Sequence, residues 1–283
     1  MRFDLKSFQF TDCERAPDAP AVVAADRSLS WSQLRAEAGA WADEARRHGA
    51  APDVPVAIYG HKEASFFVAM VGALLIGAPF VPVDTIYPEE RLRRIVEIVR
   101  AAAIYDAATQ GFEPGDGVEL AERGLAYVMF TSGSTGDPKG VQIGRESVGL
   151  LGDWMLGSFG LGEAPVFMNQ APFSFDLSMY EVFATLAAGG TCVLNSREQI
   201  GAAATWMGRL AQNGVTVWVS TPSFAHQQLA NRDFSPATLP TLRTFLFCGE
   251  PLPAALAKKL RQRFPDAAIL NTYGPTEATV ATT

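Results

Sequence analysis

Hydrophobic residues in the first ninety positions follow the spacing of helices in some stretches and of buried strands in others. Within residues 28–48, apolar side chains recur every three or four positions and Gly49 follows as a stop signal, so we expect a helix there. The long apolar run at residues 66–83 would suit a membrane span, but two prolines interrupt it. We expect instead a buried helix over about residues 61–76, followed by a buried strand at residues 79–84.

The remaining pattern continues this alternation of strands and helices. A helix is expected over residues 87–102, and another over 253–264, with short apolar runs between them that read as strands. Such alternation is typical of parallel sheets, so we predict an α/β fold with mostly parallel sheets and flanking helices. Turn-forming residues gather at 111–124, which predicts a boundary between a first α/β subdomain, 1–122, and a second, 123–283.

Polar residues follow several of the expected strands at their C-terminal ends. In open α/β sheets this edge is where ligands bind, because the turns after parallel strands meet there. We therefore expect one ligand site that gathers these turns. The residues concerned are Thr131, Ser132, Ser220, Thr221, Gly249, Glu250, Asn271 and Tyr273.

Composition and charge narrow the possible partners. The chain has 283 residues, of which 48% are hydrophobic and 19% charged, an ordinary globular balance. A net charge of -7 argues against sustained nucleic-acid binding, which needs a basic face. Cys13, Cys192 and Cys248 have no metal-ligand spacing and favour reduced thiols in a cytoplasmic protein. The first residues lack the apolar core of a signal peptide, and we expect no membrane span.

The stretch FTSGSTGDPKG, residues 130–140, combines glycines and hydroxyl side chains with a lysine. It is not a P-loop, because Lys139 follows Pro138 and the alternating residues after it indicate a strand, not a helix. Backbone N–H groups and hydroxyls in such a loop suit an anion, and Lys139 adds a positive charge. A hairpin loop whose glycines only turn the chain explains the same spacing, so the residues alone leave both interpretations open.

Several stretches of the chain resemble one enzyme superfamily. YVMFTSGSTGDPKGV resembles the phosphate-binding signature of adenylate-forming enzymes, which include acyl-CoA synthetases, luciferases and adenylation domains of nonribosomal peptide synthesis. LSWSQL, GAPFVPVD, FSFDLS and NTYGPTEATV are similar to further signatures of that superfamily, in the same order and over nearly the whole chain. NQAPFSFDLSMYEV, STPSFA and TFLFCGEPLP look most like the branch of ligases that load D-alanine onto a carrier protein.

The resemblance implies that ATP and Mg²⁺ bind at two of these stretches. Tyr273 would stack on adenine, Thr276 would contact phosphate, and Glu277 would hold Mg²⁺, a hard cation that prefers carboxylate and phosphate oxygens. Thr131, Lys139 and Glu277 would be the catalytic residues. The residues expected to bind ATP are Thr131, Ser132, Gly133, Ser134, Thr135, Gly136, Lys139, Asn271, Thr272, Tyr273, Gly274, Pro275 and Thr276.

Asp176 lies among hydrophobic residues just before an expected helix. Ser178 and Glu181 have the spacing of a capping box, which leaves the Asp176 carboxylate outside the helix. A carboxylate in apolar surroundings needs a cationic partner, and the α-ammonium of an amino acid would be one. The local sequence leaves helix capping and substrate binding open, whereas the resemblance implies substrate binding. It also implies that Cys248, Gly249 and Val280 line the amino-acid pocket, with Cys248 as a wall residue and not a nucleophile.

The reaction implied by the resemblance is the activation of a small amino acid, D-alanine first, as an aminoacyl adenylate. Pyrophosphate is released, and the amino acid then passes to the phosphopantetheine thiol of a carrier protein. Two alternatives stay open: a peptide-synthetase adenylation domain for another small amino acid, and a noncatalytic nucleotide-binding remnant. Family members continue into a small C-terminal domain with a catalytic lysine. We therefore expect this chain to be the N-terminal portion of such an enzyme and to adenylate poorly alone.

Overall fold

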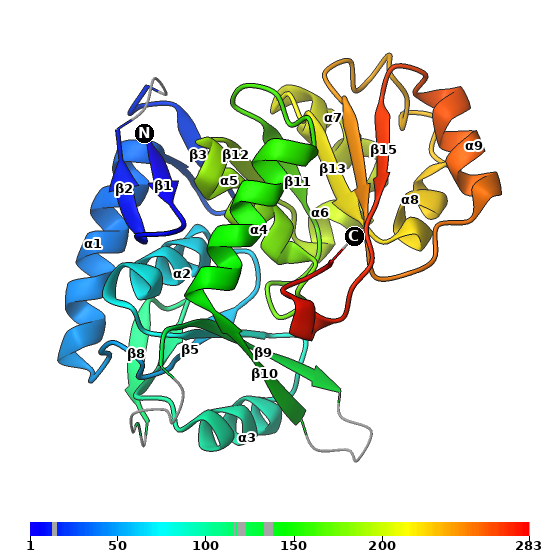
Figure 1. Ribbon diagram of the computed structural model, residues 1–283. Helices are drawn as coiled ribbons and strands as arrows, with labels where there is room; N and C mark the ends of the chain where they lie inside the picture. Colours follow the sequence, from blue (N-terminus) through cyan, green and yellow to red (C-terminus); the bar gives the residue numbers. More distant parts are fainter. Residues whose placement is uncertain (13–15, 116, 118–122, 133–137, 283) are drawn as a thin grey trace.

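Two β-sheets form the framework of the protein, and helices cover their faces (Figure 1). The structure is a computed structural model that describes residues 1–12, 16–115, 117, 123–132 and 138–282. Within these residues, the first sheet has seven strands, in the spatial order β15 (Ala268–Asn271), β14 (Thr244–Phe247), β13 (Val217–Ser220), β11 (Val166–Asn169), β12 (Thr191–Leu194), β3 (Pro20–Val23) and β4 (Ser28–Ser30). The second sheet has six described strands, in the order β10 (Pro138–Gly144), β9 (Leu125–Ser132), β6 (Phe80–Asp84), β5 (Val56–Gly60), β7 (Ala103–Asp106) and β8 (Gly111–Pro114).

Most neighbouring strands in both sheets run parallel. The antiparallel pairs are β3 with β4, β7 with β8, and β9 with β10, each at the edge of its sheet. A separate antiparallel hairpin, β1 (Arg2–Asp4) and β2 (Gln9–Thr11), begins the chain. The expected α/β fold with mostly parallel sheets and flanking helices is therefore confirmed.

Helices lie between the two sheets and on their outer faces. The helices that share one hydrophobic core with strands of both sheets are α1 (Trp31–Arg47), α2 (Ala64–Ile76), α4 (Arg145–Ser158) and α5 (Ser178–Ala188). On the outer face of the six-stranded sheet lies α3 (Glu89–Val99). The helices that pack on the outer face of the seven-stranded sheet are α7 (Ala203–Gln212), α8 (Pro222–Gln228) and α9 (Ala254–Arg263). Two short elements are α6 (Arg197–Gly201) and the 3₁₀ helix η1 (Thr276–Ala278).

The helices with the clearest hydrophobic pattern lie close to where the sequence predicts them. In α1 every apolar residue of the predicted face is buried, and Gly49 beyond its end has a left-handed φ of 88°. Helix α2 is buried on nearly all sides between the sheets, which explains an apolar run long enough to suggest a membrane span. Among the described residues, none of the helices has the length and hydrophobicity that crossing a membrane requires.

The predicted division at residue 122 does not match the sheets. Strands β3 and β4 join the seven-stranded sheet beside strands from residues 166–271, and β9 and β10 join the six-stranded sheet beside strands from residues 56–114. A cut at residue 122 would divide both sheets. Residues 111–114 of the turn-rich stretch form β8 at the edge of the six-stranded sheet, because strand order depends on pairing partners and not on turn residues alone.

The expectation of one sheet edge that carries all the motifs also needs correction. The glycine-rich stretch follows β9 in the six-stranded sheet, whereas the turns after β13, β14 and β15 belong to the seven-stranded sheet. Figure 1 shows how the two meet: the chain beyond β15, in dark red, crosses to the β9–β10 hairpin and places η1 beside it. The motifs therefore converge between two sheets, not along one.

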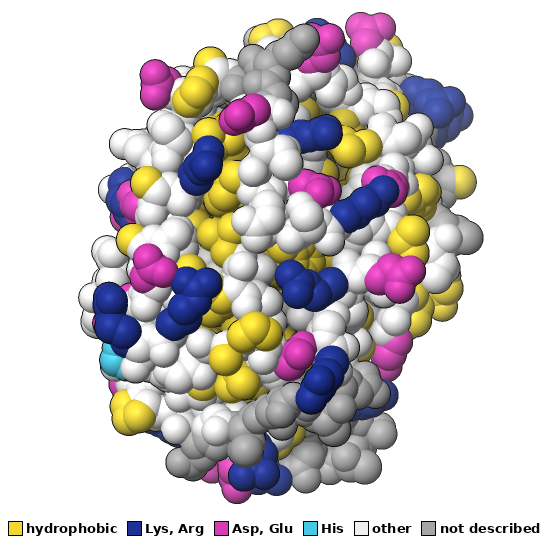
Figure 2. Space-filling model, turned by 60° about the vertical axis from the view of Figure 1, so that its left-hand side comes forward, with side chains coloured by type: hydrophobic (Ala, Val, Ile, Leu, Met, Phe, Trp, Pro, Cys, Tyr) yellow, Lys and Arg dark blue, Asp and Glu magenta, His cyan; other side chains and the backbone are white. Residues whose placement is uncertain are grey.

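The surface near the N-terminal hairpin carries charges of both signs. Figure 2 shows lysine and arginine side chains interspersed with aspartate and glutamate on this face, with small hydrophobic areas between them. A continuous basic stripe, which nucleic-acid binding would require, is not visible on this face.

Candidate functional site

The hairpin of β9 and β10 positions the glycine-rich stretch. Its register pairs Ser132 with Pro138 and Thr131 with Lys139, so the two residues that flank the glycine-rich stretch lie opposite each other. The expected strand after the loop is confirmed, and a P-loop, which requires a helix there, is excluded. Gly133, Ser134, Thr135 and Gly136 lie outside the described residues.

The segment after β15 forms a compact loop around η1. The amide of Thr282 donates to the carbonyl of Tyr273 at 3.0 Å, which closes the loop. A Cβ on Gly274 would lie 2.4 Å from the Cα of Ala281, so only glycine fits at this close approach. Asn271 and Tyr273 are exposed, and Tyr273 has 77% of its surface accessible, which leaves its ring available for stacking.

The hairpin and this loop meet through an ion pair. Lys139 Nζ donates to Glu277 Oε1 at 3.2 Å, although the two residues are 138 positions apart in sequence. Both side chains remain more than half exposed. Its own backbone amide and the Lys139 ammonium together lower the pKa of the Glu277 carboxyl. The contact thus brings a carboxylate and a lysine from two predicted motifs to one point.

Asp176 lies next to this loop. The hydroxyl of Thr276 donates to Asp176 Oδ2 at 2.6 Å, across 100 positions of sequence. Burial raises the pKa of Asp176, and the Thr276 hydrogen bond opposes that shift. In the described part of the chain, Asp176 forms no ion pair with a lysine or arginine. The site therefore holds a mostly buried carboxylate whose favourable partner would be an external cation.

The predicted capping box at the start of α5 is wrong. Ser178 lies inside the first turn, and its hydroxyl donates to the carbonyl of Phe175 at 2.8 Å. Glu181 is fully buried and accepts a hydrogen bond from Asn169 at 3.1 Å. Tertiary packing has turned this glutamate toward the core, away from the helix N-terminus. Asp176 nevertheless stays outside the helix, as expected.

Thr272, predicted to line the adenine pocket, also forms hydrogen bonds inside the protein. The side chain is buried; its hydroxyl donates to the carbonyl of Phe247 at 3.1 Å and accepts a hydrogen bond from Tyr180 at 2.9 Å. A contact between this hydroxyl and adenine would break these bonds. Thr272 therefore joins the loop to β14 and α5, and its contact with the nucleotide stays a prediction.

The three residues expected to line the amino-acid pocket lie near one another. Cys248 Sγ contacts the carbonyl of Val280 at 3.8 Å, and both side chains are buried. Burial raises the pKa of the Cys248 thiol, which agrees with a wall and not a nucleophile. Gly249 has a left-handed φ of 90° and lies beside the exposed ring of Phe175. Val280 has a φ of 77°, an uncommon conformation for a β-branched residue.

Two tyrosines near Asp176 were not identified from the sequence. Tyr180 donates to Thr272 inside the core; burial raises the pKa of the Tyr180 hydroxyl, and the hydrogen bond with Thr272 opposes that shift. Tyr127 is completely buried; burial, followed by Asp176, raises the pKa of its hydroxyl. Both occupy apolar positions of regular elements, so their sequence pattern is that of ordinary core residues.

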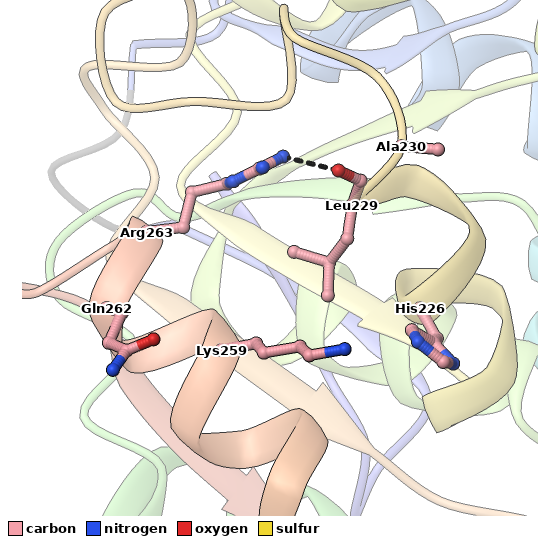
Figure 3. A pocket seen from close by; sticks show the side chains of 6 residues that line it. All are labelled: His226, Leu229, Ala230, Lys259, Gln262 and Arg263. Atoms are coloured by element: carbon pink, nitrogen blue, oxygen red, sulfur yellow. Dashed lines mark hydrogen bonds between the residues drawn. The ribbon is translucent and has the colours of Figure 1, made fainter.

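A different hollow, of about 550 Å³, lies between α8 and α9 (Figure 3). Lys259, Gln262 and Arg263 reach it from α9, while His226 and Leu229 line the other side. Arg263 donates to the carbonyls of Leu229, Asn231 and Phe234, which satisfies the C-terminal end of α8. None of the residues predicted to bind ATP or an amino acid lines this hollow. Arg263 thus has a structural explanation, and the candidate site lies elsewhere.

Glu277 is the carboxylate that the site offers to Mg²⁺. Among the described residues, no three His, Cys, Asp or Glu side chains lie close enough to hold a metal ion together. Glu277 is exposed and ionised, and it faces the hairpin expected to bind phosphates. Mg²⁺ commonly takes one or two carboxylates together with substrate phosphate oxygens. The residues present therefore fit a metal ion that arrives with a nucleotide.

Known proteins with similar sequences include several ligases. The model of the AMP-binding enzyme family matches residues 10–113 and 105–283. A D-alanine–D-alanyl carrier protein ligase of Bacillus velezensis is 37% identical over 295 residues, covering 96% of this chain and 59% of the relative. The ligase of that name from Bacillus licheniformis is 36% identical, covering 94% and 57%. The chain thus spans less than two thirds of the length of these relatives.

Solved structures share the fold. The nonribosomal peptide synthetase FmoA3 in its AMPPNP-bound form matches with a TM-score of 0.82 and 26% identity, over 99% of this chain and 32% of that one. CmiS6 matches with a TM-score of 0.81 and 26% identity, over 94% of this chain and 70% of that one. The strand and helix arrangement described above is therefore shared with adenylation domains.

Proposed function

The chain belongs to the AMP-binding enzyme family, and we propose that it binds ATP and a small amino acid for formation of an aminoacyl adenylate. The observation that carries this proposal is the pair of contacts Lys139–Glu277 and Thr276–Asp176. Residues from three separate motifs thereby gather within one site. A phosphate-binding hairpin, a carboxylate for the metal and a carboxylate for an ammonium group are the parts that this chemistry requires.

The proposed reaction depends on the positioning of both substrates and on neutralisation of the phosphate charge, and it uses no protein nucleophile. A carboxylate oxygen of the amino acid attacks the α-phosphorus of ATP, the bond from that phosphorus to the β-phosphate oxygen breaks, and pyrophosphate leaves. Lys139 and the hairpin would neutralise the departing phosphates, while Asp176 would hold the amine. Mg²⁺ would be held by Glu277 and would supply further positive charge to the phosphates. In a second step, a carrier-protein thiol would take the aminoacyl group and release AMP.

D-alanine is the amino acid we favour. The ligases of Bacillus named above support this choice, and the buried Cys248 and Val280 beside Asp176 suit a small side chain. The partner would be a phosphopantetheine-bearing carrier protein, and the compartment would be the cytoplasm, where ATP is available. The described portion of the chain contributes the nucleotide and amino-acid site; transfer to the carrier is a property proposed for the whole enzyme.

Calorimetry on the purified chain tests this function. The probes are the sulfamoyl adenosine mimics of the adenylate that carry D-alanyl, L-alanyl or propionyl groups, with AMP as reference. We expect the D-alanyl compound to bind at least about tenfold more tightly than the propionyl compound, because one charge-assisted hydrogen bond is worth that much. Preference for the L-alanyl compound would support a peptide-synthetase domain instead. Binding of AMP without any preference for an amine would support a noncatalytic nucleotide-binding module.

Replacement of Tyr273 should weaken nucleotide binding without affecting the fold. Because the ring is largely exposed, Tyr273→Ala removes little packing, and we expect the melting temperature to stay unchanged. Loss of base stacking should weaken AMP binding roughly tenfold, measured by calorimetry. Tyr273→Phe keeps the ring and should bind AMP as the wild type does. Equal affinity of the alanine variant would show that this ring does not stack on adenine.

Replacement of Glu277 should remove the effect of Mg²⁺ on ATP binding. In Glu277→Gln we expect the gain in ATP affinity on adding MgCl₂ to shrink about tenfold, because the metal loses its carboxylate ligand. AMP affinity should change little. Glu97→Gln is a matched control, since the exposed Glu97 carboxylate pairs with Arg94 within α3, away from the candidate site. A full Mg²⁺ effect in Glu277→Gln would place the metal ligand at another residue.

A further inference from the structure

A buried lysine lies in the short connection between β5 and α2. Lys62 is only 3% exposed. Its ammonium donates to the side-chain oxygen of Asn169 and to the carbonyl of Ala171, and it lies 4.1 Å from the centre of the Phe173 ring. All three contacts fall on one short segment, residues 169–173, which begins with the last residue of β11. The connection that follows a strand of the six-stranded sheet thus binds the end of a strand of the seven-stranded sheet.

The cost of burying this ammonium indicates a specific role. Burial lowers the pKa of Lys62 to about 8, and the buried Glu181 opposes that shift. Glu181 accepts a hydrogen bond from Asn169, so Asn169 connects the two ionisable groups. Buried polar groups of this kind often contribute less to stability than well-packed apolar residues would. What they provide is one defined arrangement of the segments that they join.

The segment that Lys62 holds leads directly to Asp176. Beyond Phe173 the chain turns tightly: the amide of Phe175 donates to the carbonyl of Pro172 at 2.9 Å, and α5 begins at Ser178. Asp176 is therefore held on one side by Thr276 and, through the backbone that links it to Phe173, by Lys62 on the other. Within the described residues, Lys62 contacts neither the β9–β10 hairpin nor the loop around η1.

We propose that Lys62, through its contacts with Asn169, Ala171 and Phe173, positions the Asp176 carboxylate that binds the amine of the substrate. This role rests on the proposed function of Asp176. Lys62 does not touch substrate; it fixes the backbone from which Asp176 projects. Recognition of an ammonium group depends on geometry, and displacement of the carboxylate by about 1 Å can reduce an interaction of this kind strongly. Binding of the adenosine part should not depend on Lys62.

The test compares two ligands in Lys62→Met, which keeps the length of the side chain and removes its charge. Calorimetry with alanyl and propionyl sulfamoyl adenosine reports amine recognition as the ratio of the two affinities. We expect the alanyl compound to lose about tenfold in affinity and the propionyl compound less than about twofold. Lys6→Met is the matched control, because Lys6 is exposed and pairs with Asp153 at the surface. It should leave both affinities unchanged.

A double-mutant cycle separates positioning from general support of the fold. If Lys62 acts through Asp176, Lys62→Met should have no further effect on alanyl binding in the Asp176→Ala background, within about twofold. Equal losses for both ligands, or additive losses in the cycle, would overturn the proposal. Should Lys62→Met not fold, Lys62→Met/Glu181→Gln removes both buried charges and is measured in the same way. A wild type without preference for the alanyl compound would instead contradict the function proposed for Asp176, and this inference with it.

Discussion

Asp176→Ala should abolish recognition of the substrate amine while nucleotide binding survives. The wild-type carboxylate is mostly buried and lacks an ion-pair partner in the described chain, so the ammonium of an amino acid would satisfy it. We expect the affinity for the D-alanyl mimic to fall about 100-fold, which corresponds to about 3 kcal/mol, a typical value for a hydrogen-bonded charge pair. AMP affinity should change by less than about twofold, because the nucleotide contacts other residues.

Asp176→Asn and a pH series sharpen this prediction. The amide keeps a hydrogen-bond acceptor for Thr276 but carries no charge, so its affinity for the D-alanyl mimic should also fall. Because burial raises the pKa of Asp176 above its ordinary value of 3.8, wild-type binding should weaken as the pH falls through this raised pKa, where the carboxylate gains a proton. The Asn variant should lack that dependence. Full retention of D-alanyl affinity in either variant would exclude Asp176 as the amine ligand.

Gly274→Ala should disrupt the loop around η1. The added Cβ would lie 2.4 Å from the Cα of Ala281 and 2.9 Å from the amide nitrogen of Thr282. Both are backbone atoms, so the closing hydrogen bond between Thr282 and Tyr273 has to open. We expect a loss of about 2 kcal/mol in the free energy of unfolding, as for other overpacked positions, measured by urea denaturation. AMP affinity should fall by at least about tenfold, because Tyr273 moves with the loop.

Gly208→Ala is the matched control for this change. Gly208 lies within α7, and a Cβ there would meet no atom within 4 Å. Alanine is the better helix former, so the control should gain up to about 1 kcal/mol in stability and bind AMP normally. A Gly274→Ala protein with wild-type stability and AMP affinity would mean that the loop adapts without cost. The close approach would then have no part in building the site.

Local patterns were enough to predict the individual elements. The apolar residues that reveal α1, and those that reveal α2 and the strand after it, each fall within about twenty residues. Helix and strand can therefore be predicted there without knowing which segments pack against them. Short motifs likewise indicate Lys139, Asp176 and Thr276 as candidate site residues. These residues lie together in the structure, although in two sheets instead of one.

Other features depend on contacts between distant segments. The division of the strands between two sheets follows from pairing partners far apart in sequence, such as Cys192 in β12 and Val22 in β3, which no local pattern encodes. Glu181 has the spacing of a capping residue, yet Asn169 from β11 draws it into the core. Lys62 reads as an exposed charge in the sequence, because its burial becomes apparent only when the segment after β11 packs over it.

The wide sequence separation of Lys139 from Glu277, and of Thr276 from Asp176, has a kinetic consequence. Closing loops of this length costs entropy that is recovered only when both sheets have formed and docked. During refolding, nucleotide affinity should therefore return after secondary structure and bulk compaction. Under mild denaturant it should disappear before the cores of the sheets unfold, so that the protein loses its chemistry while most of its architecture survives.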